Sequence, residues 1–327
     1  MKKAIVILAA VLALAGCKNT KPILPSVSGK AGEIIVVMEK PEWEGSLGNE
    51  VRGLLACDCP YFVQREPLYS LVNVTPSNFA DLFKVHRNIV IFNVNPQIDS
   101  TCALYKHDLW ASPQIVIQVN APTVDEAISQ LGRSAQIIVG SIEQAERDRV
   151  IRNSIRYEER SIATQVSEVF GGSPHFPSGY KLRKLTPNFA WVADEKQYTT
   201  QGVLMYKYPA GEPDPFSKEN IIKHRNETFM ANVPGMFENT YMTTSKYFDP
   251  IVEYIKYRDR QIAQTRGMWE VENDFMGGPF VSHSFYSKDG SEIIVLDAFV
   301  YAPRYDKRQY LRQTESIIYS WDWKTEE

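Results

Sequence analysis

A run of apolar residues with helical spacing, over residues 124–170, constrains the fold more than any other feature of the sequence. The apolar positions first lie four and three residues apart, which predicts one buried helix face. That spacing stops where Arg149 falls in phase, and it resumes later, displaced by three residues. One unbroken helix of this length would be roughly 70 Å long. Because that exceeds a compact domain, we expect the helix either to break, near Gly132 or Gly140, or to bridge two domains.

The start and the middle of this helical region carry polar signals. Thr123-Val-Asp-Glu126 is a capping box, in which the two outer side chains bond free N–H groups of the first turn. The stretch 143–160 is rich in charge, and Glu143 stands four residues before Arg147, as in a helical ion pair. The simpler interpretation of this stretch is a solvated helix face. The alternative is a docking surface for a partner.

Strands alternate with helices before this region. Apolar residues with helical spacing follow Glu44, and also Thr75-Pro76, where threonine is the expected N-cap and proline the first helical residue. An apolar run predicts a buried strand at residues 33–38, and segments rich in apolar residues predict further strands at 68–74, 88–94 and 115–119. This order indicates a small sheet covered by helices.

The sequence becomes rich in strands after Gly171-Gly-Ser-Pro174, which is interpreted as a domain boundary. The clearest local feature is a hairpin over 280–301, whose turn pair Asp289-Gly290 suits type I′. Further strands are expected within 180–193 and at 202–208, and helices at 218–232 and 304–320. Both helices follow a pair of strands, which hints at a duplicated ββα unit with two helices on one face of a shared sheet.

We therefore predict an α+β fold. It consists of a small N-terminal α/β sheet domain, a long helical segment, and a C-terminal antiparallel sheet with helices on one face. The predicted segments are residues 1–16 (a leader), 17–32 (a flexible tether), 33–122, 123–171 and 172–327.

The first residues form an export signal. Two lysines precede 12 apolar residues, Ala4 to Ala15, which span roughly 18 Å as a helix and fall short of the ~30 Å bilayer core. The junction Leu14-Ala15-Gly16-Cys17 resembles the lipobox of bacterial lipoproteins. The resemblance implies cleavage before Cys17 and acylation of that residue, which would anchor the mature chain to a membrane. Lys18 after the cysteine implies transfer to the outer membrane, facing the periplasm.

The composition argues against a nucleic-acid partner and favours a binding protein. The net charge is −3, and loss of the leader removes two lysines, so the chain has no basic footprint for nucleic acid. Aromatic residues make up 12% of the chain, which leans towards a binding protein, although a core rich in strands explains the same excess.

Three cysteines remain after Cys17, and their state is left open. In the oxidising periplasm, Cys102 could pair with Cys57 or Cys59, or all three could stay reduced. A Cys-x-Cys pair can also ligate metal, but four ligands at known spacings are missing, so no metal site is predicted.

No local motif indicates catalysis. The sequence contains no nucleophile elbow, zinc-binding His-Glu-x-x-His, phosphate loop or dinucleotide fingerprint, so no catalytic residue and no cofactor is predicted. The tripeptide His-Arg-Asn occurs at 86–88 and 224–226, where the arginines could grip a carboxylate or phosphate. Its two contexts, a strand entry and a helix face, favour coincidence.

Other polar positions have a structural interpretation that is simpler than the functional one. His283 alternates with apolar residues on one strand face, as a core histidine does. Glu270, Glu272 and Asp274 could bind a hard cation, but charge on an edge strand is simpler. The segments 64–67 and 232–236 are loops in which binding residues tend to sit, or turns.

A short motif predicts one modification. Asp99-Ser100-Thr101 resembles the O-glycosylation acceptor of Bacteroidota envelope proteins, which would modify Ser100.

Several segments resemble an uncharacterised lipoprotein family of Bacteroidota, known only as a domain of unknown function. They are the lipobox, Gln64-Arg-Glu-Pro67, His86-Arg-Asn-Ile-Val, Ser112-Pro-Gln-Ile-Val, Asn232-Val-Pro-Gly235 and Thr240-Tyr-Met-Thr-Thr. The resemblance implies no activity and no catalytic residues. We therefore expect an envelope lipoprotein that binds or scaffolds without catalysis and contacts the membrane through Cys17, with a possible envelope protein partner. The alternative is an envelope hydrolase of glycan or peptide bonds that uses paired carboxylates.

Overall fold

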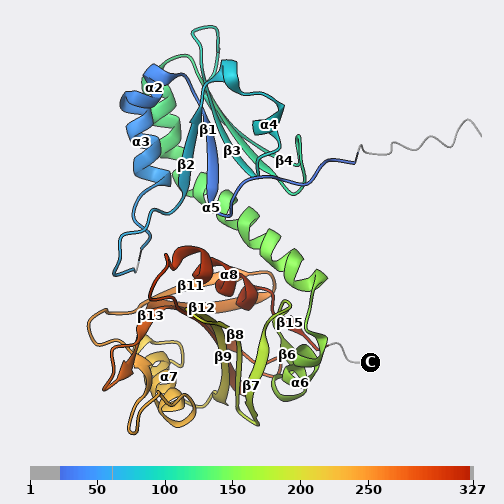
Figure 1. Cartoon of the computed structure of the whole chain (residues 1–327), viewed down its shortest axis with the longest axis vertical. Coiled ribbons are helices and arrows are strands. Elements are labelled where there is room, and N and C mark those ends of the chain that lie inside the picture. Colours follow the sequence, from blue (N-terminus) through green and yellow to red (C-terminus); the bar gives the residue numbers. More distant parts are fainter. Residues whose placement is uncertain (1–22, 61, 325–327) are drawn as a thin grey trace, which may run out of the picture.

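The structure, a computed structural model, describes residues 23–60 and 62–324. Cys17, the leader and the first residues of the tether lie outside the described residues. Two sheets, one above the other in Figure 1, are joined by one long helix, and a smaller body of helix and strand adjoins the lower sheet. Within the described ranges no helix is long and apolar enough to cross a membrane.

The upper sheet contains five strands in the order β2-β1-β3-β5-β4. The chain pairs β1, β2, β3 and β5 in parallel, and β4 runs antiparallel to β5. The strands are β1 (Glu33–Val37), β2 (Ser70–Val74), β3 (Asn88–Val94), β4 (Cys102–His107) and β5 (Ile115–Ala121). The four predicted strands are therefore confirmed. The edge strand β4 was missed because its half-exposed sequence, CALYKH, has no apolar run.

Both faces of this sheet are covered, which explains the apolar runs of its inner strands β1, β3 and β5. On one face, Ile34 and Val36 pack beneath helix α3 (Ser46–Leu55) and the long helix α5, next to the short helix α2 (Lys40–Glu44). On the other face, Ile35 and Val37 pack beneath the segment that carries Phe79 and Phe83.

The helix predicted after Thr75-Pro76 is wrong in length and in its cap. The segment forms only a 3-10 turn, η1 (Pro76–Asn78), and a single helical turn, α4 (Asp81–Lys84). The Thr75 side chain makes no cap bond. This short crossover covers only a small area of the sheet. Phe79 and Phe83 are enough to cover it without a regular helix.

The long helix α5 (Val124–Arg156) bridges the two sheets without a break. Thr123 Oγ1 accepts the N–H of Glu126, which confirms the predicted cap. Gly132 and Gly140 lie inside the helix with open space around them. The chain turns only at 157–159, before α6 (Arg160–Phe170), which packs into the core of the lower sheet.

The register break in the apolar spacing reflects buried charge. Glu146 and Arg149 are both buried on α5 and contact each other. Arg87 Nη2 lies 3.0 Å from Glu146 Oε2, and Arg149 Nη1 donates to Asn88 Oδ1 at 3.0 Å. The buried face of the helix therefore continues, but with polar residues, and apolar periodicity cannot detect it.

The charged stretch of α5 is not a solvated face throughout. Glu143 accepts from Arg312 Nη2 at 2.7 Å, and the Arg147 guanidinium lies 3.8 Å from the centre of the Tyr319 ring. Both partners belong to α8 (Arg308–Tyr319), a helix of the lower body. The simpler interpretation is wrong for these residues, because the stretch docks onto another part of the same chain.

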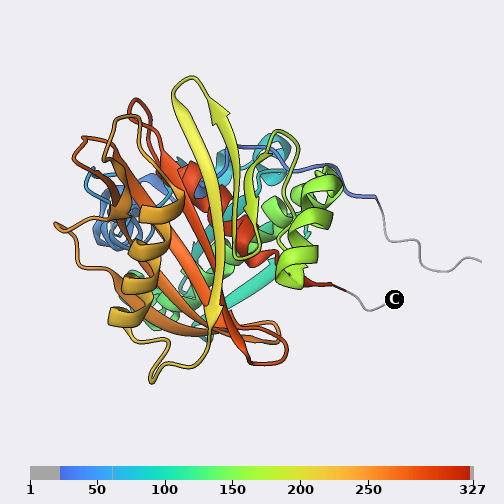
Figure 2. The ribbon, with the colours of Figure 1, turned by 90° about the horizontal axis from the view of Figure 1, so that it is seen from below.

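The lower sheet has eight strands, all antiparallel, and is strongly curled (Figures 1 and 2). Seven follow the order β10-β12-β13-β14-β9-β8-β7, and β11 pairs with β12 beside β10. The strands are β7 (Lys181–Thr186), β8 (Phe189–Lys196), β9 (Thr199–Pro209), β10 (Tyr241–Thr244), β11 (Ile251–Tyr257), β12 (Arg260–Glu272), β13 (Gly277–Tyr286) and β14 (Glu292–Tyr301). A separate pair joins β6 (Gly172–Ser173) to β15 (Asp322–Trp323).

The predicted α+β class and the C-terminal antiparallel sheet are confirmed, but the helices do not share one face. Val281 and Leu296 pack in the same core as α8 and α6, whereas Phe280 and Val295 pack in the core of α7 (Lys218–Asn232). Because β13 and β14 are apolar on both faces, each face has its own helix cover. Helices on opposite faces do not support a duplicated ββα unit.

The predicted hairpin is confirmed, with a different turn. β13 and β14 pair from Phe280 to Tyr286. Gly290 has a positive φ of 74°, but Asp289 is not among the residues with positive φ, so the turn is not type I′. Five residues, 287–291, separate the strands, and a longer loop needs only one left-handed residue.

Candidate functional site

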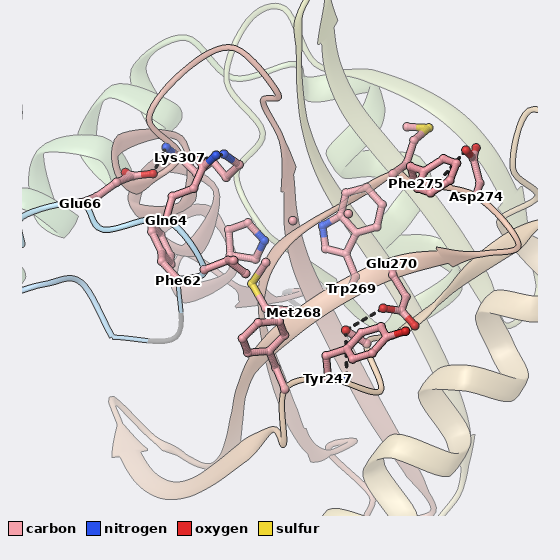
Figure 3. A pocket seen from close by; sticks show the side chains of 17 residues that line it. Phe62, Gln64, Glu66, Tyr247, Met268, Trp269, Glu270, Asp274, Phe275 and Lys307 are labelled. Atoms are coloured by element: carbon pink, nitrogen blue, oxygen red, sulfur yellow. Dashed lines mark hydrogen bonds between the residues drawn. The ribbon is translucent and has the colours of Figure 1, made fainter.

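An aromatic cleft lies where the loop after α3 meets the β10–β12–β13 end of the lower sheet (Figure 3). Its volume is about 360 Å³. The loop contributes Phe62, Val63, Gln64 and Glu66; the sheet and its loops contribute Tyr247, Phe248, Met268, Trp269, Glu270, Asp274, Phe275 and Met276. We call this set the aromatic cleft. It is assembled from segments that lie at least 181 residues apart in the chain, the separation of Glu66 and Tyr247.

Gly278 makes room for one wall of this cleft. Gly278 pairs with Trp269 across β12 and β13. A Cβ atom at Gly278 would lie 2.1 Å from the carbonyl oxygen of Val300, so any larger residue would displace the strand. The same carbonyl accepts the indole N–H of Trp269 at 3.2 Å. The glycine therefore lets the indole lie against the strand and form one wall.

The mouth of the cleft exposes large apolar side chains. Phe275 is fully exposed at the tip of the β12–β13 connection, and Tyr247 is 85% exposed in the loop between β10 and β11. Both lie on the Trp269 side in Figure 3, while Phe62 and Met268 lie across from them. Exposed aromatic rings gathered at one site are typical of binding surfaces.

Each carboxylate of the cleft already accepts a hydrogen bond within the chain. Glu66 accepts the backbone N–H groups of Lys307 and Arg308, both at 2.8 Å, and so caps the N-terminus of α8 from a distant loop. Glu270 accepts from Ser245 Oγ at 2.7 Å, drawn as a dashed line in Figure 3, and Asp274 accepts the N–H of Phe275.

A general acid of the carboxyl type needs a raised pKa and a free position next to its substrate. Burial raises the pKa of two carboxyl groups, Glu42 and Asp297, and neither of them lines the cleft.

A second cleft, of about 530 Å³, separates the two bodies next to the first. Its arginines are Arg147, Arg266, Arg308 and Arg312. Arg312 bonds Glu143, and Arg266 bonds Glu315. Burial alone would raise the pKa of Glu143, but the Arg312 charge and bonds from Arg312 and Tyr69 outweigh it and lower that pKa. These pairs join α5 to α8 and the lower sheet, so the second cleft is mainly a structural ion-pair network.

Both His-Arg-Asn tripeptides are structural. Arg87 bonds Glu146, and Arg225 bonds Asp297, so both arginines do grip carboxylates, but buried ones of the protein itself. The two histidines also bond glutamates, His86 to Glu33 and His224 to Glu212. The similarity lies in chemistry and not in fold, since one tripeptide enters a strand and the other lies on α7.

The acidic residues of β12 do not converge on a cation. Glu270 lines the cleft, whereas Glu272 bonds Lys246. In the part of the chain that the structure describes, no three potential ligands gather to hold a metal ion. The expected edge strand is also wrong, because β12 has partners on both sides. His283 is fully buried beside Gln264, and burial lowers its pKa, as for a core residue.

The remaining predicted positions are scattered. Gln64 and Glu66 belong to the cleft, but the 232–235 segment forms a turn in which Gly235 bonds Thr240. Ser100 is exposed in the loop between β3 and β4. The thiols of Cys57, Cys59 and Cys102 form no disulfide. Sequence reasoning missed Tyr247, Trp269 and Phe275, and the only available signal was an aromatic residue next to expected turns.

Two family models of unknown function together match most of the chain. Residues 27–154 match the model described as Domain of unknown function (DUF8532), and residues 159–320 match Domain of unknown function (DUF4837). The matches meet at the junction of α5 and α6. They support an uncharacterised domain family and add no activity.

Two solved structures align with parts of the chain. One, a crystal structure from Bacteroides thetaiotaomicron VPI-5482, is 12% identical with a TM-score of 0.26, and the alignment covers 48% of this chain and 46% of that one. The other, LpqN, involved in cell envelope biogenesis of Mycobacterium tuberculosis, is 13% identical with a TM-score of 0.26, covering 45% and 81%. This chain thus spans less than half of the Bacteroides structure, and at these TM-scores neither alignment assigns a function. No curated protein matches.

Proposed function

We propose that the protein is a lipid-anchored cell-envelope component of a Bacteroidota lipoprotein family, which binds a protein partner through the aromatic cleft and performs no catalysis. The observation that carries the proposal is the cleft itself. Its exposed rings offer contact area, and its carboxylates are already engaged in structural hydrogen bonds. A binding site needs the first property, whereas a carboxylate-based hydrolase would need free acids.

The apolar character of the cleft favours a protein partner over a sugar. Phenylalanine and methionine supply five of its lining side chains, Phe62, Phe248, Phe275, Met268 and Met276. Methionine adapts to varied apolar side chains. A sugar carries a hydroxyl group on most carbons, and desolvating those groups requires hydrogen-bond partners; in this cleft Glu66, Glu270 and Asp274 already accept hydrogen bonds from within the chain.

The position of the cleft is compatible with an anchor at Cys17. The described chain begins on one side of the molecule, while the β10–β11 and β12–β13 connections lie on the other side in both views (Figures 1 and 2). Only five residues lie between Cys17 and Ile23, which corresponds to at most about 20 Å of chain. The aromatic cleft therefore favours an occupant in the periplasm over the anchoring bilayer.

Crosslinked purification from membranes tests the partner. We expect wild-type protein to recover an envelope protein that a Tyr247→Asp/Phe275→Asp variant loses, because two charges at the mouth oppose apolar docking. Tyr157→Asp is the matched control, since Tyr157 is also more than half exposed but lies at the α5–α6 junction. An equal yield from both variants, or turnover of glycan or peptide by the purified protein, would refute the proposal.

Mass spectrometry of the natural protein tests the anchor and the modification. We expect the natural chain to begin at an acylated Cys17. A Cys17→Ala variant should not be transferred to the outer membrane. A glycan mass on the peptide that contains Ser100 should vanish in Ser100→Ala. A retained leader or an unacylated start would remove the envelope assignment.

A further inference from the structure

Strand β11 leaves one edge of the eight-stranded sheet open. It pairs only with β12, through a turn of two residues, Arg258–Asp259, that joins Tyr257 to Arg260. A two-residue turn closes on a pair that exchanges both backbone hydrogen bonds, and such pairs alternate along the ladder. The backbone groups of Val252, Tyr254 and Lys256 therefore point away from β12. Among the described residues, none bonds these outward groups.

The opposite edge of the sheet is protected in the usual ways. β7 carries Lys181, Arg183 and Lys184, and its register shifts between Leu182 and Lys184. Charged residues and bulges are devices that keep an edge strand from pairing with another chain.

β11 lacks the bulge and carries two charged residues of opposite sign, Glu253 and Lys256, where β7 carries three basic ones. Its register with β12 is continuous over all seven residues, and it contains no proline. Tyr254 is 71% exposed and Ile251 is 43% exposed. An open edge that displays apolar side chains is a template for strand pairing, so the contrast with β7 marks β11 as the edge that is available.

Side-chain sites adjoin this edge at two points. The loop that carries Tyr247 and Phe248 leads directly into β11, so the aromatic cleft adjoins its N-terminal end. A smaller hollow of about 260 Å³ lies beside Tyr254 and is bordered by Phe216 and Tyr286. Recognition by strand addition combines backbone pairing with pockets for alternate side chains.

We propose that an extended, apolar segment of a partner protein adds as a strand to β11 and places a large apolar side chain in the aromatic cleft. The inference rests on the proposed function and specifies its partner. The unpaired N–H and C=O groups of β11 select a polypeptide, because a glycan or an acyl chain cannot match alternating donors and acceptors at strand spacing.

A second copy of this chain fits the edge poorly. A twofold axis through Tyr254 would pair Val252 with Lys256 and Glu253 with Ile255, which sets an apolar residue against a charged one in both pairs; only Ile251 with Tyr257 and Tyr254 with its own copy would match. Cross-strand pairs of matched character stabilise a sheet. A partner of different sequence is therefore the better occupant.

The test uses the full protein, purified from membranes in detergent, and a phage-displayed library of random peptides of about 12 residues. We expect enriched peptides to alternate apolar residues and to include a large aromatic one. N-methylation of alternate amides should then separate two sets: methyl groups that face β11 weaken binding about tenfold or more, and those that face solvent do not. This readout leaves the protein unchanged, so it does not depend on the folding of a variant.

Substitutions on the two edge strands provide a second, independent test of strand addition. Val252→Pro removes an outward N–H without breaking the β12 ladder, and should abolish peptide binding. Arg183→Pro on the opposite edge is the control and should leave binding unchanged. Enrichment of no alternating peptide, equal effects of both methylation sets, or a dimer in sedimentation that Tyr254→Lys dissolves would overturn the inference. If membrane purification recovers a cleft-dependent partner while methylation shows no alternation, strand addition fails and the proposed function stands.

Discussion

The ion pair between Arg225 and Asp297 offers the sharpest test of how the lower body is held together. Both side chains are fully buried between α7 and β14. Arg225 Nε donates to Asp297 Oδ2 at 2.8 Å, and its guanidinium lies 3.7 Å from the centre of the Phe280 ring and 4.6 Å from that of Phe229. The pair therefore fixes α7 on its face of the sheet.

Arg225→Met keeps most of the buried volume but leaves Asp297 without its counter-charge. Breaking a buried pair from one side lowers the free energy of unfolding by about 3–5 kcal/mol. For a body of this size that corresponds to a fall in Tm of roughly 6–20 °C. Replacing both partners, with Arg225→Met and Asp297→Leu, also removes the unpaired buried carboxylate. The double variant should therefore recover most of the lost free energy of unfolding.

The loss should also depend on pH. Burial raises the pKa of Asp297, and Arg225 opposes that rise. Without Arg225 the folded-state pKa rises further above the unfolded value near 3.8, so folding favours the protonated form. Stability is then retained at low pH and lost as pH rises through the folded pKa. Urea unfolding followed by circular dichroism should show a larger defect at pH 8 than at pH 5. A loss below about 1 kcal/mol, or a double variant as unstable as the single one, would refute this reasoning.

Three further predictions concern the joint between the bodies and the cleft. Arg312 lowers the pKa of Glu143, so Glu143→Gln should destabilise the protein by about 1–2 kcal/mol at pH 7, and urea titrations should show the difference shrinking as pH falls below 4.5. Glu66→Ala removes the cap of α8 and should lower unfolding free energy by about 1 kcal/mol and speed proteolysis of the joint; unchanged cleavage would contradict the cap. Gly278→Ala should destabilise by about 1–3 kcal/mol, because its Cβ meets the Val300 carbonyl, and should weaken partner binding; wild-type thermal unfolding would count against the close approach.

Much of the upper sheet could be predicted because its signals are local. Three strands, β1, β3 and β5, are largely buried and contain apolar runs, and the Thr123 cap bonds a residue only three positions away. The edge strand β4 and the short η1–α4 crossover carry no such signal and were missed or misjudged. The lower hairpin was found for the same reason as the strands, and its turn was not, because loop length and φ depend on how the strands pair.

The candidate site was largely beyond prediction. Gln64 and Glu66 stood in a segment already singled out, but their role follows from contacts with α8, about 240 residues away. Tyr247, Trp269 and Phe275 come from strands and loops that only the sheet register brings together. The charged stretch of α5 was visible, yet whether it met water or another helix depended on where α8 packs.

The amino-acid order alone determined the helices and strands that carry a local apolar period, and it supplied the N-terminal pattern that predicts the anchor, because both signals lie within a few neighbouring residues. Tertiary structure decided which charges are paired and buried, which face each helix covers, which edge of the sheet stays open, and where aromatic side chains converge. Those outcomes depend on contacts between residues tens to hundreds of positions apart, and such contacts leave no period in the sequence.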